Sequence, residues 1–256
     1  MIIAPFSDRK PRAEIDLFCL AYAGGSTAVY RDWDRLFPDW IAVRPVEYPG
    51  RGMRMGEALA TDPDALATRL ADELRPALTR PWAIFGHSLG AALGYRLALA
   101  TGASRPPLAL FASGRHSPSH PDPSRRRSHL ADAALVEEVR ALNGSPAEVL
   151  DNAELLPLVL PVIRADFRLS EIISRQPCHR ILPCALHVFG GADDPEVPAA
   201  ALEHWRDVAG PGFGRTLLPG DHFFLHHDAQ LDRIRRQICT DLADLLARPA
   251  RQGAQA

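Results

Sequence analysis

The sequence is poor in residues and patterns that mark several classes of protein. Its four cysteines form no C-x-x-C pair and have no histidines at zinc-site spacing, so we expect reduced, mostly buried thiols in a cytoplasmic protein. No apolar run approaches about 18 residues, so no segment is expected to span a membrane. The first residues lack a basic region followed by an apolar stretch, which argues against a secretory signal and a secreted lipase.

The sequence also has no large excess of acidic or basic residues. The formal net charge is −2, which leaves no basic field for nucleic acid, and Lys10 is the only lysine among the 29 basic residues. Three arginines at 125–127 stand in a loop rich in proline, serine and histidine, where a solvated face is expected. With 256 residues and 46% hydrophobic content, the chain can bury the core of one compact catalytic domain over residues 1–256.

The most informative feature is a G-x-S-x-G motif at residues 86–90. It follows a short apolar run at 82–85 and precedes a helical pattern at 91–101, which is the context of a nucleophile elbow. A sharp turn there would lift the Ser88 hydroxyl above the sheet edge, with the N-terminus of the next helix facing any anion formed beside it. The motif therefore predicts that Ser88 is a nucleophile.

Strand and helix patterns alternate along the rest of the chain, which predicts a mostly parallel central sheet with helices on both faces. Together with the elbow, this indicates an α/β-hydrolase fold. A helix is expected to open at residues 61–64, and an apolar stripe from 231 to 245 predicts a closing helix followed by a frayed tail at 248–256. The expected strands lie at residues 17–20, 41–46, 82–85, 108–112, 185–189 and 215–218.

An insertion at about residues 114–183 interrupts the alternation. After an irregular loop at 116–128, helical segments are expected near 131–142 and 146–150, followed by an apolar stretch at 155–163 with two prolines. A helix apolar on every side should be buried, and prolines should kink it. The position predicts a lid over the nucleophile whose apolar surface lines an acyl tunnel or covers the site, although plain packing would explain most of these leucines. Arg164 and Asp166 could pair with each other or hold the lid to the body.

Chain order in this fold places the acid after the serine and the base last. His222 lies in a loop after the strand at 215–218, where it can reach across the sheet edge as the base. The acid is expected after the strand at 185–189, where Asp193 and Asp194 precede a proline. Asp194 is favoured because the residue before proline is held extended, which fixes its side chain. Asp193 would then be a solvated residue or a cap, and Asp221, a neighbour of the base in sequence, usually would point away from it.

The remaining histidines are expected to be structural. His87 should pack beside the nucleophile, and surface or core roles are expected for His204, His226 and His227.

Several segments together resemble the type II, free-standing thioesterases that serve non-ribosomal peptide and polyketide synthases. They run in order from about residue 15 to 246, and the Pro-Gly-Arg-Gly and Arg-Ala-Asp-Phe segments are more specific than the elbow. One departure is Tyr22, where such enzymes often carry histidine. The matching segments are Ala-Tyr-Ala-Gly-Gly-Ser at 21–26, Tyr-Pro-Gly-Arg-Gly at 48–52, Gly-His-Ser-Leu-Gly at 86–90, residues 156–169 with Arg-Ala-Asp-Phe at 164–167, residues 191–194 and residues 220–225.

An oxyanion hole in this fold takes one N–H from the residue after the nucleophile, Leu89, and one from the loop after an early strand, at Ala23. The resemblance implies hydrolysis of acyl or aminoacyl groups from the phosphopantetheine arm of carrier proteins, in clearing stalled or misprimed synthases, with no cofactor or metal. Two alternatives stay open: a small-molecule carboxylesterase or lipase with the same catalytic residues, and a non-enzymatic binding module. An intact set of Ser88, Asp194 and His222 argues against the module.

Overall fold

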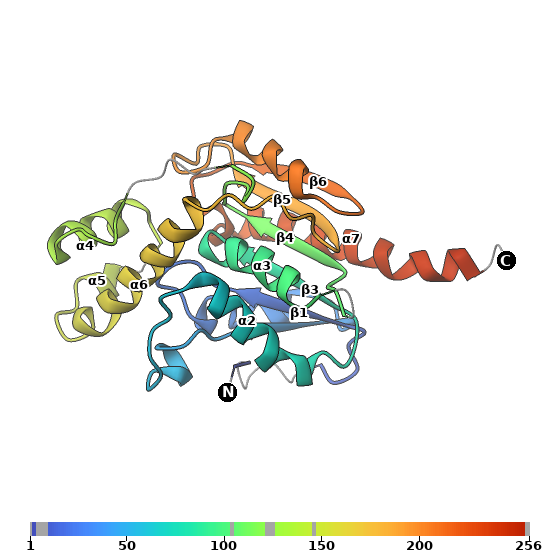
Figure 1. The fold of residues 1–256 in the computed structure, drawn as a ribbon, viewed down its shortest axis with the longest axis horizontal. Helices are drawn as coiled ribbons and strands as arrows, with labels where there is room; N and C mark the ends of the chain where they lie inside the picture. Colours follow the sequence, from blue (N-terminus) through green and yellow to red (C-terminus); the bar gives the residue numbers. More distant parts are fainter. Residues whose placement is uncertain (1, 4–9, 103–104, 121–125, 145–146, 254–256) are drawn as a thin grey trace.

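A six-stranded parallel sheet forms the centre of the molecule (Figure 1). The computed structural model describes residues 2–3, 10–102, 105–120, 126–144 and 147–253. Within these residues the strand order is β2-β1-β3-β4-β5-β6, and every neighbouring pair is parallel. The carboxyl ends of all six strands therefore meet at one edge of the sheet. The strands are β1 (Ile15–Leu20), β2 (Ile41–Val46), β3 (Trp82–His87), β4 (Ala109–Ser113), β5 (Ala185–Gly191) and β6 (Phe213–Leu218).

The strands form where the apolar runs predicted them, with ends that differ by one or two residues. Strands of a parallel sheet are buried on both faces and read as nearly continuous apolar stretches, which is why they are visible in the sequence. All residues of β1, β3 and β4 are buried. The predicted α/β-hydrolase architecture, with a parallel sheet covered on both faces, is confirmed.

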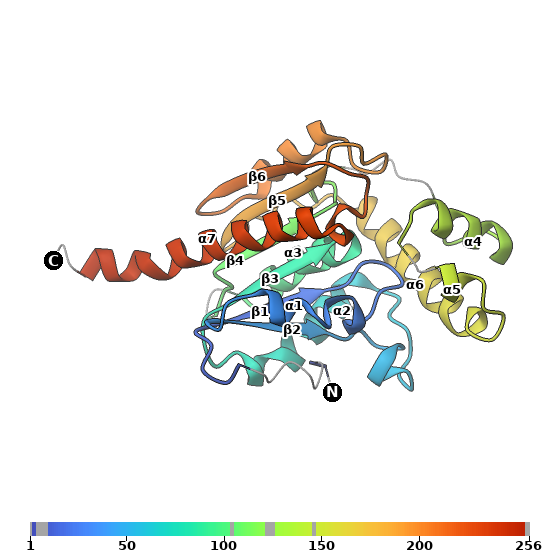
Figure 2. The ribbon, with the colours of Figure 1, turned by 180° about the vertical axis from the view of Figure 1, so that it is seen from behind.

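Helices cover the two faces of the sheet in separate hydrophobic clusters. On one face, α2 (Pro63–Leu74), α3 (Leu89–Ala100) and η5 (Ala199–Val208) pack against β-strand residues such as Ile84 and Leu110. On the other face, α1 (Trp33–Leu36) and α7 (Asp228–Gly253) pack against residues such as Phe85 and Phe111 (Figure 2). The other short helices are η2 (Thr27–Tyr30), η3 (Gly52–Arg54), η4 (Arg75–Ala77) and η6 (Phe224–His226).

Helix α2 begins at the predicted place. Asp62 is its N-cap and accepts hydrogen bonds from the N–H groups of Asp64 and Ala65 at 2.9 and 2.8 Å. Pro63 occupies the first position, where a missing N–H has no consequence. The cap and the proline together set the start of the helix.

The last helix extends further than the sequence predicted. Ile234, Ile238 and Leu242 of α7 are buried against the sheet, as the apolar stripe indicated. The helix then continues to Gly253, so the tail predicted at 248–256 begins within α7, and residues 254–256 lie outside the described residues.

Three helices fill the insertion between β4 and β5. They are α4 (Asp132–Ala141), α5 (Ala147–Leu150) and α6 (Leu156–Ser174), and Figure 1 shows them beyond the carboxyl ends of the strands. The first part of α6 packs with α4 and α5 in a hydrophobic cluster of its own, whereas Leu169 and Ile173 near its end belong to the main core. Helix α6 therefore connects the insertion to the body of the protein.

The structure shows how the apolar stretch at 155–163 folds and corrects one expectation about it. It belongs to one unbroken helix of 19 residues that contains Pro161, because a proline removes a single backbone hydrogen bond and packing of Leu160 and Ile163 maintains the helix. The stretch is not buried all round, since Leu158 is 57% exposed.

Candidate active site

Ser88 lies in a sharp turn between β3 and α3. Its backbone has φ 54° and ψ −115°, a conformation that few residues with a side chain adopt, and its N–H donates to the Ser113 carbonyl at 2.8 Å. The flanking glycines make the turn possible. A Cβ at Gly86 would lie 2.2 Å from the Gly90 carbonyl oxygen, and one at Gly90 would lie 2.1 Å from the Leu20 carbonyl oxygen. The G-x-S-x-G spacing is therefore required by the close crossing of strand and helix.

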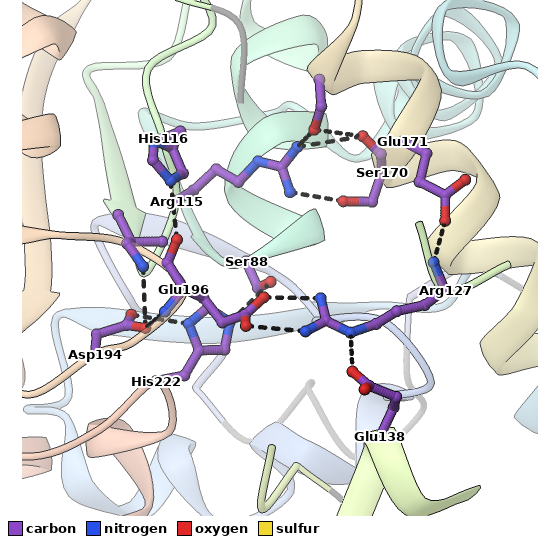
Figure 3. Close-up of polar contacts among 12 residues, drawn as sticks. Ser88, Arg115, His116, Arg127, Glu138, Ser170, Glu171, Asp194, Glu196 and His222 are labelled. Carbon is purple, nitrogen blue, oxygen red and sulfur yellow. Dashed lines mark hydrogen bonds and ion pairs between the residues drawn. The ribbon is translucent and has the colours of Figure 1, made fainter. Parts of the chain in front are cut away.

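Ser88, His222 and Asp194 form a continuous chain of contacts (Figure 3). The Ser88 Oγ lies 3.1 Å from His222 Nε2, and His222 Nδ1 lies 2.8 Å from Asp194 Oδ2. Each residue comes from a different loop at the carboxyl edge of the sheet, following β3, β6 and β5 respectively. This is the arrangement in which an imidazole can take a proton from a serine while a carboxylate fixes its tautomer.

Asp194 is held in place by the backbone that follows it. Its Oδ1 accepts hydrogen bonds from the N–H groups of Glu196 and Val197 at 2.8 and 3.1 Å, which leaves Oδ2 for His222. The two rival aspartates are elsewhere. Asp193 is exposed, and Asp221 accepts from the Phe223 N–H and from Asn143.

His87 packs beside this chain, as the sequence indicated. Its ring centroid lies 5.1 Å from that of His222, and its Nδ1 lies 2.9 Å from Ser113 Oγ. Burial, followed by the neighbouring His222 and His226, holds the pKa of His87 well below its usual 6.5. The ring is therefore neutral at neutral pH.

Two of the histidines expected to be structural have clear surroundings. His204 stacks on His120 with ring centroids 3.9 Å apart, and His226 Nε2 lies 3.3 Å from the Tyr22 hydroxyl. Burial raises the pKa of Tyr22 to about 12, so this phenol stays protonated. Tyr22, the position where the sequence departs from its family resemblance, thus packs between His87 and Phe223.

The loop after β1 faces the same site. Ala23 and Ser88 line one cavity. Leu89 is the first residue of α3, and the N–H groups at the start of a helix have no partner within the helix. The next residue, Gly24, has φ 78° and donates its N–H to Asp166 Oδ2 at 2.8 Å. The two residues predicted for the oxyanion hole are thus both placed next to the serine.

Known proteins show the same pattern over nearly the whole chain. The family described as "Thioesterase domain" matches residues 15–242. The chain belongs to the thioesterase family.

Its relatives include the protein named linear gramicidin dehydrogenase LgrE of Brevibacillus parabrevis, 41% identical over 223 residues, which are 85% of this chain and 84% of the relative. The thioesterase PikA5 of Streptomyces venezuelae is 33% identical over 245 residues, covering 92% and 82%. Among solved structures, the RedJ thioesterase of the prodiginine pathway in Streptomyces coelicolor superposes with a TM-score of 0.81 at 35% identity, covering 91% of this chain and 87% of that one. The protein is a thioester hydrolase with the α/β-hydrolase fold of type II thioesterases.

In this thioesterase, a cavity of about 60 Å³ adjoins Ser88 and His222. Val139 of α4 and Phe167 of α6 contribute apolar wall, so the insertion covers part of the site, although no residue of the predicted stretch 155–163 lines it. Four charged residues also line the cavity: Arg115, Arg127, Glu171 and Glu196.

These charged residues were missed by sequence reasoning. Arg127 was expected in a solvated loop, but its side chain is only 7% exposed and binds Glu196 and Glu138 (Figure 3). Arg126 is exposed, and Arg125 lies outside the described residues. A local pattern of polar residues cannot show that an arginine finds two carboxylates far along the chain.

Other classes of site have less support. Within the described ranges, no group of three or more histidine, cysteine or acidic side chains could hold a metal ion. In the same ranges, no helix is long and apolar enough to cross a bilayer.

Proposed function

We propose that this thioesterase hydrolyses acyl or aminoacyl thioesters carried on the phosphopantetheine arm of carrier proteins, with Ser88, His222 and Asp194 as its catalytic residues. The observation that carries the proposal is the chain of contacts from Ser88 Oγ to His222 at 3.1 Å and on to Asp194 at 2.8 Å. The same three side chains extend from three loops of one sheet edge, which is where α/β-hydrolases place a serine nucleophile, its acid and its base.

Acylation begins when Ser88 Oγ attacks the thioester carbonyl carbon and its proton passes to His222 Nε2. Asp194 accepts the Nδ1–H of His222 and stabilises the imidazolium that forms. The N–H groups of Ala23 and Leu89 receive the negative oxygen of the tetrahedral intermediate. Cleavage of the carbon–sulfur bond releases the thiolate, which takes the proton from His222 and leaves an ester on Ser88.

Deacylation repeats these steps with water. His222 takes a proton from the water as its oxygen attacks the ester carbonyl, and the second tetrahedral intermediate uses the same two N–H groups. Collapse of this intermediate returns the proton to Ser88 Oγ and releases the carboxylic acid. Every proton that leaves one step is used in the next, so this chemistry is complete with the chain's own residues and water.

The names of similar proteins support a carrier-protein substrate. Similar proteins are named for biosynthetic pathways, among them the gramicidin S biosynthesis protein GrsT and ClbQ from the colibactin NRPS/PKS pathway. The insertion at residues 114–183 would act as a lid that excludes water until an arm enters, since α4 and α6 already wall the cavity. A cytoplasmic location fits this role and the four free cysteines.

The name of LgrE suggests hydride transfer, but the residues here suit a hydrolase. A dinucleotide fingerprint places glycines at the first, third and sixth positions of the turn after a strand. The turn after β3 has Gly86, Ser88 and Ala91 at those positions. The serine at the centre of this turn instead faces His222.

The test compares three substrates with the same acyl group, attached to a carrier protein, to N-acetylcysteamine or to a simple alcohol, at two salt concentrations. We expect the highest kcat/KM for the carrier protein, because remote contacts supply binding energy that a small thioester lacks. Equal efficiencies for the two thioesters would remove the case for a protein partner, and preference for the alcohol ester would favour a carboxylesterase.

A further inference from the structure

A buried ion pair joins two segments that the mechanism above does not use. Arg51, in the loop after β2, donates two hydrogen bonds to Asp166 of α6, from Nη1 to Oδ2 at 2.5 Å and from Nη2 to Oδ1 at 2.6 Å. The side chains are only 7% and 1% exposed, and 115 residues separate them in sequence. Such a two-point contact fixes the relative orientation of both groups.

Both partners also bind the loop that follows β1. Asp166 Oδ2 accepts the N–H of Gly24 at 2.8 Å, and Arg51 Nη1 donates to the Gly25 carbonyl at 3.1 Å. The ion pair therefore holds one N–H and one C=O of consecutive residues, directly after Ala23. With Gly24 at φ 78°, the two contacts set the backbone of the loop at the point where Ala23 turns toward the cavity.

Helix α6 also packs closely against the same loop. A Cβ at Gly24 would lie 2.8 Å from Ile163 Cγ1, three residues before Asp166 in that helix. Tyr48, in the segment after β2, contacts both the ion pair and the loop. The Arg51 guanidinium lies 5.1 Å from the Tyr48 ring centroid, and the Tyr48 hydroxyl donates to the Ala21 carbonyl at 3.0 Å. The loop is thus held between the segment after β2 and the insertion.

Stability alone does not account for such a pair. Removing two charges from water is unfavourable, and well-packed apolar residues of similar volume often stabilise a fold as well or better. What apolar residues could not do is accept the Gly24 N–H and donate to the Gly25 carbonyl at the same time. The arrangement is suited to orienting backbone groups.

We propose that Arg51 and Asp166 are positioning residues that aim the Ala23 N–H at the oxyanion. The proposal rests on the function proposed above, and it assigns a shared purpose to the Pro-Gly-Arg-Gly and Arg-Ala-Asp-Phe segments. Displacement of a catalytic group by about 1 Å can lower turnover by a factor of about 100. The pair acts through Ala23 and does not touch the reacting atoms.

The test uses Arg51→Lys and Asp166→Asn, with Asp132→Asn as the matched control. Asp132 of α4 pairs at 2.6 Å with Arg164, which lies in α6 like Asp166 but donates its other hydrogen bonds to the Ser128 and Leu130 carbonyls. Arg51→Lys keeps the charge but not the two parallel hydrogen bonds, and Asp166→Asn keeps an acceptor for Gly24 but not the charge. Four quantities are measured: kcat, KM, the dissociation constant of a non-hydrolysable thioether analogue, and that of a trifluoromethyl ketone.

The ketone forms a hemiketal with Ser88, so its oxyanion reports on the hole, whereas the thioether reports only on ground-state binding. For both variants we expect kcat to fall about ten- to a hundredfold and ketone affinity to fall by a similar factor. KM and thioether affinity should stay within about threefold of the parent, since uniform binding is untouched. Asp132→Asn should leave all values near the parent.

Equal ketone affinity in Arg51→Lys, Asp166→Asn and the control Asp132→Asn would overturn the proposal, as would losses of thioether and ketone binding by the same factor. If Asp166→Asn fails to fold, as judged by its thermal transition, Arg51→Lys decides the question alone. Ser88→Ala distinguishes this outcome from failure of the proposed function. Retained hydrolysis in Ser88→Ala would refute the catalytic mechanism. If Ser88→Ala is inactive while Arg51→Lys and Asp166→Asn are fully active, only the positioning role is refuted.

Discussion

Arg127 donates two hydrogen bonds to Glu196, at 2.8 and 2.9 Å, although 69 residues separate them. Glu196 in turn donates its N–H to Asp194 Oδ1, and Arg127 also binds Glu138 of α4 at 3.0 Å. One guanidinium therefore joins the insertion to the loop that carries Asp194, the acid of the proposed triad. Its partners are partly exposed, with 22% and 24% of their side chains accessible, which moderates the energy of the contacts.

Replacement of Arg127 by glutamine should therefore weaken the fold more than catalysis. We expect the free energy of unfolding to fall by about 1–3 kcal/mol, because two carboxylates lose a hydrogen-bonding partner, and the thermal midpoint to fall by several degrees. The backbone bonds to Asp194 remain, so kcat should fall less than about tenfold. Arg126→Gln is the control, since that side chain is exposed. Identical thermal midpoints for the two variants would contradict the structural role.

Ser88→Ala and His222→Ala should each abolish nearly all hydrolysis, with kcat reduced by a factor of about 10⁵ to 10⁶. The double variant should be no worse than either single one, because the two side chains act as a unit. Thermal midpoints should stay near that of the parent. Steady-state kinetics on an acyl-carrier substrate checks this, and substantial turnover by Ser88→Ala would exclude the serine mechanism.

The three aspartates near the site should differ sharply when each is replaced by asparagine. Asp194→Asn should lower kcat about ten-thousandfold, by analogy with other serine triads. Asp193→Asn should have little effect because that side chain is exposed, and Asp221→Asn should affect mainly the Phe223 turn that it caps. A large loss at Asp193 or Asp221 with a small one at Asp194 would transfer the acid role.

His87 should make stability sensitive to acid. Its pKa is held well below 6.5 in the folded protein by burial, so below pH 6.5 the unfolded chain binds a proton that the folded chain does not. Stability is therefore lost as pH falls from 6.5 toward the folded pKa, by at most about 1.4 kcal/mol per pH unit from this one group. Denaturant titrations between pH 7.5 and 5 should show a smaller slope for His87→Gln than for the parent, whatever its absolute stability. An unchanged slope would show that His87 is not the group responsible.

Much of the fold could be predicted because its signals are local. The six strands are apolar runs, and α2 begins at an aspartate followed by proline. The elbow is likewise a local pattern, since Gly86 and Gly90 are required by contacts within one turn and its neighbouring strand. The positions of His222 and Asp194 followed from the order of loops along the sheet edge rather than from any motif of their own.

The ion pairs could not be predicted, because their partners are distant in sequence. Asp166 could have paired with its near neighbour Arg164, yet it binds Arg51, while Arg164 binds Asp132 and two carbonyls. Residues two apart on a helix point to different sides, which separates these two partners. The continuation of α6 through Pro161 also depends on packing with α4 that no local pattern contains.

Helix α6 has one further consequence for substrate selection. It supplies Phe167 to the wall of the cavity and Asp166 to the loop after β1, on adjacent residues. If the proposed positioning role holds, an acyl group large enough to push this helix outward would also pull Asp166 away from Gly24. Oversized substrates would thus bind yet react slowly, so discrimination by chain length should be found in kcat more than in KM. The helix that contacts the acyl group would then be the same helix that positions the loop after β1, so substrate length would control the rate of the chemical step.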